Sequence, residues 1–145
     1  MQCPYCSNTK SEVINKRNKD RIVRRRRQCL KCRKRFTTYE RYDITLNIIK
    51  KDGRHEPYNR EKVKNGLLKA CEKRPINNEK IDEIIDSIEN KLRTLKNREI
   101  KSILIGEEIM KHLKKLDKVA YIRFASVYRE FKDIDDFKKE IKKIN

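Results

Sequence analysis

The sequence predicts an α+β protein: a small β module in residues 1–45, followed by a mostly helical domain that opens with a short β-hairpin. Two observations predict this division. Four cysteines in two closely spaced pairs lie within the first 32 residues, and apolar residues recur at helical spacing only after residue 44. Because 43% of the 145 residues are charged and 36% are hydrophobic, two small units are more consistent with the sequence than one large core.

The two cysteine pairs have the spacing of a metal site. Cys3 and Cys6 form one C-x-x-C pair, Cys29 and Cys32 form the other, and 22 residues separate them. A two-residue spacer lets a tight turn aim both thiolates at one ion, and two such turns complete a tetrahedral site. Strands are predicted between the pairs, at residues 12–15 and 22–26. The order of turn, hairpin and turn predicts a zinc ribbon with one Zn²⁺ per chain, whose folding energy comes from the metal.

Two other interpretations of these cysteines are a dithiol redox site and free surface thiols. The spacing of two pairs favours the metal site over both. The fifth cysteine, Cys71, lies in a helical pattern beside Leu67, Leu68 and Ala70, so we expect it to be a buried apolar residue.

Positive charge is concentrated in the first module. Residues 1–45 contain 14 Lys and Arg against 4 Asp and Glu, a net charge of +10 out of +18 for the chain. This favours a polyanionic partner, with a solvated basic surface as the alternative. Side chains alternate along a strand, so Arg24 and Arg26 are expected on one face and Arg25 and Arg27 on the other. Such a ribbon can set arginines against nucleic-acid phosphates and base edges.

Two aromatic residues follow the second cysteine pair. Packing over the zinc site is the role we expect for Phe36 and Tyr39, and stacking on a base is the alternative. Nucleic acid is the partner that the charge favours, but charge does not separate DNA from RNA.

The second domain is predicted from residue 46 to 136, with a short tail at 137–145. A strand at 44–51 is followed by the turn Asp52-Gly53 and a returning segment at 55–58. Asn59 is expected to cap a helix that ends near residue 73, before Pro75.

Three further helices follow in the apolar pattern, and residues 133–145 form either a weak amphipathic helix or a frayed tail. The second helix starts near residue 78. Ser102 and Asp117 are expected to cap the third and fourth. The apolar stripes are Ile81, Ile84, Ile85, Ile88, Leu92 and Leu95 in the second helix, Ile105, Ile109, Leu113 and Leu116 in the third, and Tyr121, Phe124, Ala125 and Tyr128 in the fourth.

Lysines gather around the predicted hairpin. Lys50 and Lys51 end its first strand, Gly53 permits a close backbone approach, and Lys62 lies in the first turn of the next helix. Converging lysines at a helix N-terminus can hold a polyphosphate. The alternative is an ordinary solvated turn, since Lys-Asp-Gly sequences are common.

Taken together, these stretches resemble the bacterial ribonucleotide-reductase repressor family, NrdR, over nearly the whole chain. The second segment is similar to an ATP-cone, a nucleotide-binding regulatory module. The resemblance implies a repressor that senses ATP and dATP, forms homo-oligomers and binds double-stranded DNA operators upstream of reductase genes. The matching segments are CPYC, VRRRRQCLKCRKRFTTYE, KKDGRHEPYNREKVKNGLLKACEKRP and KKLDKVAYIRFASVYREF.

The resemblance also implies roles for individual residues. The zinc ligands are Cys3, Cys6, Cys29 and Cys32. The DNA-facing residues are Arg17, Arg24, Arg25, Arg26, Arg27 and Arg35. The nucleotide site contains Lys50, Lys51, Gly53, Glu56, Lys62, Tyr121 and Tyr128. One departure from the family pattern is at Ile100-Lys101-Ser102, where a proline usually precedes the serine; it lies where a helix is expected to begin.

Two other functions are weighed against the repressor. The first is an enzyme, either an ATPase or a small nucleotide kinase, and the second is an accessory ribbon protein of RNA polymerase. The chain has three glycines and no Gly-x-x-x-x-Gly-Lys-Ser/Thr loop, which disfavours the enzyme. No signal peptide and no bilayer-spanning apolar run is visible, so a cytoplasmic location without membrane contact is expected.

Overall fold

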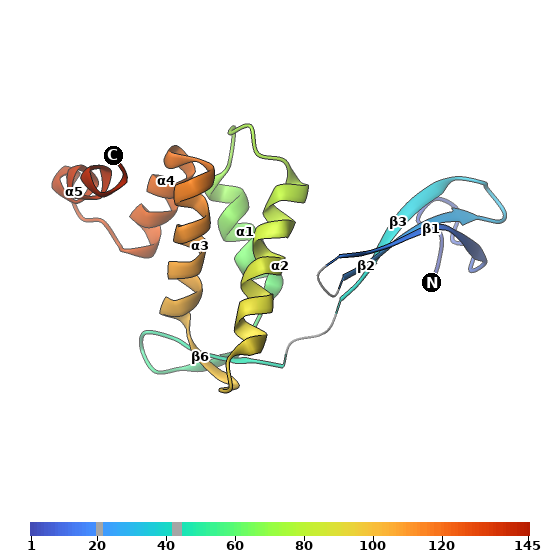
Figure 1. Ribbon diagram of the computed structural model, residues 1–145, viewed down its shortest axis with the longest axis horizontal. Helices are drawn as coiled ribbons and strands as arrows, with labels where there is room; N and C mark the ends of the chain where they lie inside the picture. The colour runs from blue at the N-terminus through green and yellow to red at the C-terminus, as the bar shows by residue number, and fades with distance from the viewer. Residues whose placement is uncertain (20–21, 42–44) are drawn as a thin grey trace. The chain divides into compact units, whose positions relative to one another are not determined.

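The computed structural model describes residues 1–19, 22–41 and 45–145 of the chain (Figure 1). The chain divides into two compact units, Met1–Asp43 and Ile44–Asn145. The first unit contains only strands, and the second combines a small sheet with five helices among the described residues. The predicted α+β class is confirmed, with a ribbon first and a mostly helical domain second.

The first unit is a three-stranded antiparallel sheet in the order β1-β2-β3. Its strands are β1 (Ser11–Lys19), β2 (Ile22–Cys29) and β3 (Arg35–Glu40). The first two extend beyond the predicted segments, and the third was not predicted. Its run Phe-Thr-Thr-Tyr consists of β-branched and aromatic residues, which fit a strand. A register shift between Val13 and Asn15 marks a bulge in β1, which adds local twist.

The two aromatic residues of β3 differ in their surroundings. Tyr39 lies opposite Arg24, is 47% exposed, and its ring centroid is 5.0 Å from the Arg41 guanidinium. The expectation that Tyr39 packs over the metal site is therefore wrong: the register places it four residues along β3 from Arg35, which lies beside the cysteines. Phe36 is half-buried near that cysteine end, opposite Arg27.

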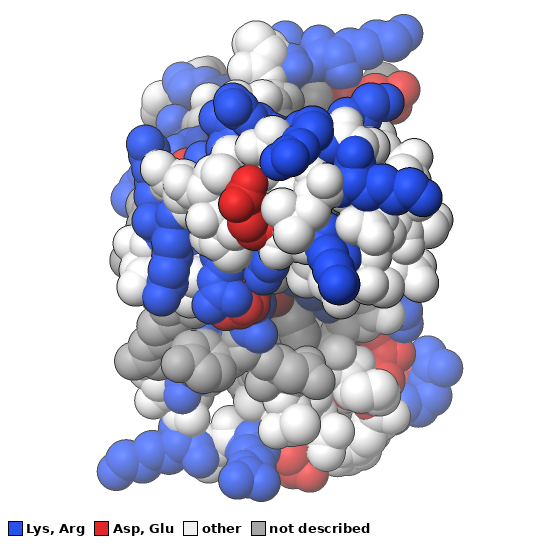
Figure 2. All heavy atoms as spheres, turned by 90° about the vertical axis from the view of Figure 1, so that its right-hand side faces the viewer, with Lys and Arg blue, Asp and Glu red and all other residues white. Residues whose placement is uncertain are grey.

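Among the charged side chains on the visible surface of the ribbon, basic ones prevail over acidic ones. In the view from the ribbon end, Lys and Arg side chains extend in several directions and acidic side chains are few (Figure 2). This agrees with the net charge of +10 that the sequence gives for residues 1–45.

The sheet of the second unit has the order β5-β4-β6. The hairpin strands are β4 (Asn47–Ile49) and β5 (His55–Pro57), and β6 (Glu99–Lys101) runs parallel to β4. β4 is shorter than the predicted strand at 44–51, whose first residue, Ile44, lies outside the described residues. β6 was not predicted, because three residues with one buried side chain, Ile100, carry almost no periodic signal.

Five helices complete the second unit: α1 (Arg60–Ala70), α2 (Asn78–Thr94), α3 (Ser102–Leu116), α4 (Lys118–Tyr128) and α5 (Ile134–Ile144). Two predicted caps are confirmed, because Asn59 accepts from the Lys62 amide and Asp117 from the Ala120 amide. The predicted cap at Ser102 is wrong. Ser102 is the first helical residue, and the cap position before it has no side-chain hydrogen bond. α1 ends at Ala70, three residues before the predicted end.

The core forms where the helical stripes meet the sheet. The α2 stripe is buried from Ile81 to Leu92, and each such side chain contributes about 1.5–3 kcal/mol by its transfer from water. Leu95 does not belong to it, since it follows the helix and is 40% exposed. Cys71 is 5% exposed, as predicted, and burial raises the pKa of its thiol, which keeps the thiol protonated.

The C-terminal segment is a packed helix rather than a frayed tail. Asp133 caps α5 by accepting from the Asp136 amide. Glu140 is 2% exposed and accepts from the Tyr121 hydroxyl at 2.6 Å and from Arg129 at 2.9 Å, so it joins α5 to α4. A buried carboxylate held in this way fixes the position of α5. Within the described residues, no helix is long and apolar enough to cross a membrane.

Candidate functional site

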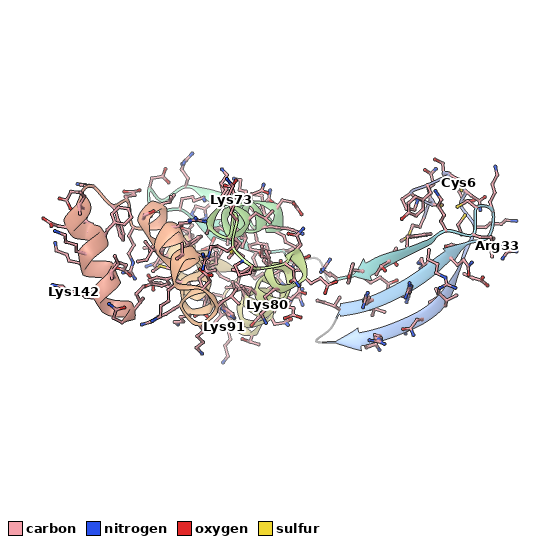
Figure 3. All side chains as sticks on the ribbon, turned by 90° about the horizontal axis from the view of Figure 1, so that it is seen from above. Cys6, Arg33, Lys73, Lys80, Lys91 and Lys142 are labelled. Atoms are coloured by element: carbon pink, nitrogen blue, oxygen red, sulfur yellow. The ribbon has the colours of Figure 1, made fainter. Side chains whose placement is uncertain are left out.

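The four cysteines of the two pairs converge at one end of the ribbon. Their Sγ atoms all lie within 4.8 Å of one another. Cys3 and Cys32 are 3.7 Å apart at sulfur, and Cys6 and Cys29 are 3.6 Å apart. Both distances are too long for a disulfide, whose S–S bond is about 2.05 Å. Figure 3 shows Cys6 and Arg33 together at this end.

The two cysteine turns have the same backbone structure. In the first, Ser7 donates to the Cys3 carbonyl at 2.9 Å; in the second, Arg33 donates to the Cys29 carbonyl at 3.0 Å. Ser7 and Arg33, each directly after the second cysteine of its pair, have φ of 56° and 60°. Each turn therefore reverses the chain tightly enough to direct both thiols of its pair to the same point.

These sulfurs fit a tetrahedral zinc ion. Four sulfurs at about 2.3 Å from zinc would lie about 3.8 Å apart, close to the observed separations. The backbone N–H of Cys32 lowers the pKa of Cys29 to about 6, which favours the thiolate. At Cys32 the Lys34 amide lowers the pKa, but burial and the neighbouring sulfurs outweigh it and raise the pKa to about 11. Zinc binding therefore displaces protons.

The strand register sorts the arginines of the ribbon onto two faces. Directly opposite residues share a face, and Arg17 lies opposite Arg24, while Gln28 lies opposite Arg35. Because Arg24, Arg26 and Gln28 alternate along β2, they share one face. We call Arg17, Arg24, Arg26 and Arg35 the arginine face; all four are exposed.

The other two predicted arginines, Arg25 and Arg27, lie on the opposite face and contact the protein itself. Arg25 forms an ion pair with Glu40. Arg27 donates to the Thr38 hydroxyl at 3.1 Å and to the Ser11 hydroxyl at 3.5 Å. The predicted alternation along β2 is confirmed, since Arg25 and Arg27 are half-buried where Arg24 and Arg26 are exposed.

A second cluster forms at the hairpin of the other unit. Lys50 Nζ lies 3.1 Å from Glu56 Oε1, and Lys62 Nζ lies 3.3 Å from both oxygens of Glu56. The hydrogen bond from Lys50 is the first cause that lowers the pKa of Glu56. Gly53 has φ of 85° and turns the hairpin. Four of the predicted nucleotide-site residues are thus brought together.

Lys51 and Tyr128 form the adjoining contact. The Lys51 ammonium lies 5.3 Å from the Tyr128 ring centroid and donates to the Tyr128 carbonyl at 3.2 Å. The Tyr128 hydroxyl donates to the Ile103 carbonyl at 2.9 Å. The ring fills the space over Gly106, where a Cβ would lie 2.1 Å from it. Tyr128 thereby joins the hairpin, α3 and α4.

Tyr121 is not brought to these lysines. It is 5% exposed, and its hydroxyl is held by Glu140. Burial is the first cause that raises the pKa of Tyr121 to about 12, and the Glu140 carboxylate adds to it. Among the contacts of the described residues, none joins Tyr121 to Lys50, Lys51 or Lys62.

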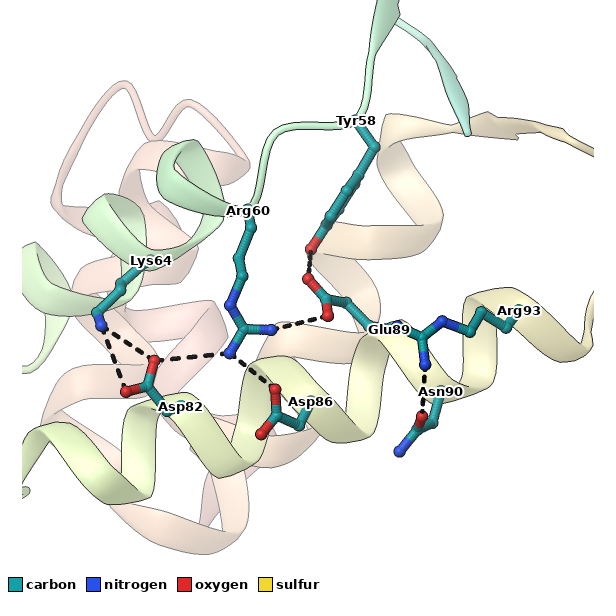
Figure 4. A network of polar contacts seen from close by, with 8 residues as sticks. All are labelled: Tyr58, Arg60, Lys64, Asp82, Asp86, Glu89, Asn90 and Arg93. Carbon is teal, nitrogen blue, oxygen red and sulfur yellow. Dashed lines mark hydrogen bonds and ion pairs between the residues drawn. The ribbon is translucent and has the colours of Figure 1, made fainter. Parts of the chain in front are cut away.

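A polar network holds the lysine-bearing end of α1 on α2 (Figure 4). Arg60, the first residue of α1, lies 2.7 Å from Asp86 and 2.7 Å from Glu89. The Tyr58 hydroxyl donates to Glu89 at 3.0 Å, and burial together with the Glu89 charge raises the pKa of Tyr58. This fixes the first turn of α1, which carries Lys62.

Comparison with known proteins covers both units. The family described as "Transcriptional repressor NrdR-like, N-terminal domain" matches residues 1–40, and the ATP cone domain matches residues 46–134. The transcriptional repressor NrdR of Petrotoga mobilis is 52% identical over 147 residues, covering 99% of this chain and 98% of that protein. The transcriptional repressor NrdR of Clostridioides difficile is 53% identical over 146 residues, covering 99% and 95%. This chain belongs to the NrdR family.

Membership in the NrdR family confirms the resemblance seen in the sequence. The chain is a transcriptional repressor and not an enzyme, with a zinc ribbon followed by a nucleotide-binding ATP cone. Four of its five cysteines, Cys3, Cys6, Cys29 and Cys32, are arranged to bind zinc.

Some candidate residues of the NrdR ATP cone were missed in the sequence. A hollow of about 660 Å³ lies between α1 and α4 and shares Tyr128 with the hairpin cluster. The only signal in the sequence was Gly66, because a glycine inside a helix costs about 1 kcal/mol relative to alanine. The structure gives that glycine no steric reason, since a Cβ there would meet Phe124 at an ordinary 3.8 Å. The lining residues that were not predicted include Gly66, Lys69, Lys73, Arg123, Phe124 and Val127.

Proposed function

We propose that this chain represses ribonucleotide reductase genes by binding operators upstream of them, under the control of ATP and dATP. The observation that carries the proposal is the presence in one chain of an exposed arginine face next to a four-cysteine cluster and of a lysine-rich hairpin in an ATP cone. The arginine face can bind the phosphates of a DNA backbone, and the lysine-rich hairpin can bind the phosphate chain of a nucleotide.

The ribbon supplies DNA binding in this proposal. Cys3, Cys6, Cys29 and Cys32 hold one zinc ion per chain, which stabilises a module with few apolar residues. The arginine face contacts double-stranded DNA. Arg25 and Arg27 were also predicted to face DNA, but their contacts with Glu40, Thr38 and Ser11 favour a role in holding the sheet.

The hairpin cluster supplies nucleotide binding. Lys50 and Lys62 share the Glu56 carboxylate, so a phosphate chain of higher negative charge can replace Glu56 as their partner. Lys51 and Gly53 belong to the same hairpin turn. Tyr128 contacts Lys51 and also lines the hollow between α1 and α4. That hollow has room for the part of the nucleotide beyond the phosphates. The buried position of Tyr121 gives it no support as a contact residue.

Nucleotide control is proposed to act through assembly of the chains. A ligand shifts an equilibrium only by its differential affinity for two states, and ATP and dATP differ by one hydroxyl. The two states are homo-oligomers whose ribbons are, or are not, spaced to meet successive half-sites on DNA. Exposed apolar residues on the helices are candidate subunit contacts: Val127 is 80% exposed, Ile134 71% and Ile141 43%. A repressor of bacterial genes acts in the cytoplasm, where its DNA is.

The test uses the full zinc-loaded chain and a duplex from a reductase promoter, beside an unrelated promoter duplex of equal length. Binding is measured without nucleotide, with ATP and with dATP, and phosphate release is followed in the same samples. We expect selective binding of the reductase duplex that changes with nucleotide, and no steady phosphate release. Steady ATP turnover would favour an enzyme. DNA affinity that is the same for both duplexes and does not change with nucleotide would favour an accessory ribbon protein of RNA polymerase.

A further inference from the structure

The four arginines of the arginine face lie in three rows of directly opposed residues, which together contain nine side chains on the same side of the sheet. Residues paired across the sheet lie about 4.8 Å apart and point the same way. The first row is Arg17, Arg24 and Tyr39, the middle row is Asn15, Arg26 and Thr37, and the third is Glu12, Gln28 and Arg35. Eight of these nine side chains are exposed, and Gln28 is half-buried.

The rows differ in what they offer a ligand. Phosphate oxygens only accept hydrogen bonds, whereas base edges present both donors and acceptors. The first row offers two guanidinium donors, which suit phosphates. The middle row combines one guanidinium with an amide and a hydroxyl, which can donate and accept. In the third row, Glu12 repels phosphates and Gln28 donates to the Arg33 carbonyl at 3.1 Å, so Arg35 is its phosphate contact.

The residues of the middle row are also available. Neither Arg26 nor Asn15 has a hydrogen-bond or ion-pair partner among the residues that the structure describes. Arg25 and Arg27, on the opposite face, would have to release Glu40 and Thr38 before reaching a ligand. Arginine pairs in bidentate fashion with the guanine edge and asparagine with the adenine edge, so this row can read sequence.

We propose that the arginine face docks on duplex DNA with Asn15 and Arg26 reading base edges, while Arg17, Arg24 and Arg35 contact phosphates. This assignment rests on the proposed DNA-binding function and adds which residues give specificity. Arg25 and Arg27 hold the sheet.

The test compares specific with non-specific binding. The full chain, loaded with zinc and dATP, selects a duplex from a random-sequence library, and a scrambled duplex of the same composition is the reference. Asn15→Ala and Arg26→Lys should each weaken binding of the selected duplex roughly 5- to 150-fold. Because neither removes a positive charge, binding of the scrambled duplex and the salt dependence should stay unchanged. Equal loss on both duplexes would overturn the assignment of this row to base edges.

The second comparison tests the choice of face with matched charge. Arg24→Gln/Arg26→Gln and Arg25→Gln/Arg27→Gln each remove two positive charges, and glutamine keeps a hydrogen-bonding side chain in the sheet. The first pair should weaken binding to both duplexes and flatten the slope of log affinity against log salt by about 0.9 per lost phosphate contact. The second pair should leave the slope unchanged at full zinc content. Equal flattening by both pairs would overturn the assignment of DNA contact to the arginine face. The Asn15→Ala and Arg26→Lys variants would then still test whether the middle row reads base edges. A wild-type chain that enriches no sequence would overturn the proposed function, and this inference with it.

Discussion

The Lys62 ammonium lies 3.3 Å from both carboxylate oxygens of Glu56. The same carboxylate accepts from Lys50 at 3.1 Å, so one acidic group on β5 links the end of β4 to the first turn of α1. These contacts are partly exposed, where an ion pair is worth about 0–1 kcal/mol. The free-energy cost of replacing Glu56 by a phosphate chain as the partner of the two lysines is therefore small.

The first prediction concerns these lysines. Lys50→Ala or Lys62→Ala should weaken ATP and dATP binding about 10- to 150-fold, because each removes a charge-assisted phosphate contact worth about 1.5–3 kcal/mol. Lys80→Ala is the control, since Lys80 is exposed on α2 and pairs only with nearby Glu83 among the described residues. Isothermal titration measures all three variants. Wild-type affinity in the Lys50 and Lys62 variants would remove both lysines from the site.

The second prediction uses two helical glycines. Gly106→Ala should destabilise the second unit by about 1–3 kcal/mol, because its Cβ would lie 2.1 Å from the Tyr128 ring and displace that ring from Lys51. Gly66→Ala is the matched control. Its Cβ meets Phe124 at an ordinary 3.8 Å, and alanine favours the helix by up to about 1 kcal/mol. Denaturant unfolding of both variants checks this; equal effects would show that Tyr128 is not held over Gly106.

Local patterns in the sequence were sufficient for part of the fold and the sites. The cysteine spacing predicted the metal cluster, and the caps at Asn59 and Asp117 were predicted because a short polar side chain before a helix can accept from the amides of its first turn. The alternation of Arg24 and Arg26 against Arg25 and Arg27 needed only the period of a strand.

Features that depend on distant partners were not predictable in this way. β6 has three residues and is a strand only because β4 lies beside it. The family resemblance assigned Tyr121 to the nucleotide site, but its environment is decided by Glu140, 19 positions later on a segment for which a frayed tail was one of the two expectations. The bulge between Val13 and Asn15 sets which residues of β1 lie opposite the arginines of β2, and no local signal marks it.

The third prediction concerns Glu140 and acid stability. Burial alone would raise the pKa of Glu140, but hydrogen bonds from Tyr121 and Lys143 outweigh it and lower the pKa. In the unfolded chain the pKa of a glutamate is about 4.3. A carboxyl whose pKa is lower in the folded chain stabilises the fold fully at pH values above this unfolded pKa. That contribution is lost as the pH falls through the folded pKa.

Glu140→Gln should therefore cost about 1–3 kcal/mol at pH 7 and less as the pH approaches 3. Denaturant unfolding between pH 3 and pH 7 measures the difference between variant and wild type. Glu83→Gln, at an exposed position of α2, is the control. A difference that does not shrink at low pH would show that the carboxylate charge is not what holds α5.

The fourth prediction concerns zinc. Protein purified without chelator should contain one zinc per chain, and Cys29→Ser should lose zinc and unfold the ribbon, because the metal supplies the folding energy of this module. Cys71→Ala is the control: it removes a thiol that lies outside the cluster, so zinc content should stay at one. Elemental analysis and circular dichroism provide the readouts. A ribbon that stays folded without metal would contradict the prediction.

The fifth prediction is that nucleotide acts through the size of the assembly. A dATP-loaded form, with or without ATP bound as well, should be the strong DNA binder, and ATP alone should favour an assembly that binds poorly. In the proposed mechanism each ribbon makes the same contacts with DNA in both states, and the difference in affinity comes from how many ribbons meet DNA together and at what spacing.

The most direct test measures assembly mass by light scattering and affinity for a reductase-promoter duplex on the same samples, with no nucleotide, ATP or dATP. The account predicts that mass and affinity change together, with tight binding in the dATP sample and weak binding with ATP alone. A DNA affinity that switches with nucleotide while the mass stays fixed would contradict control by assembly.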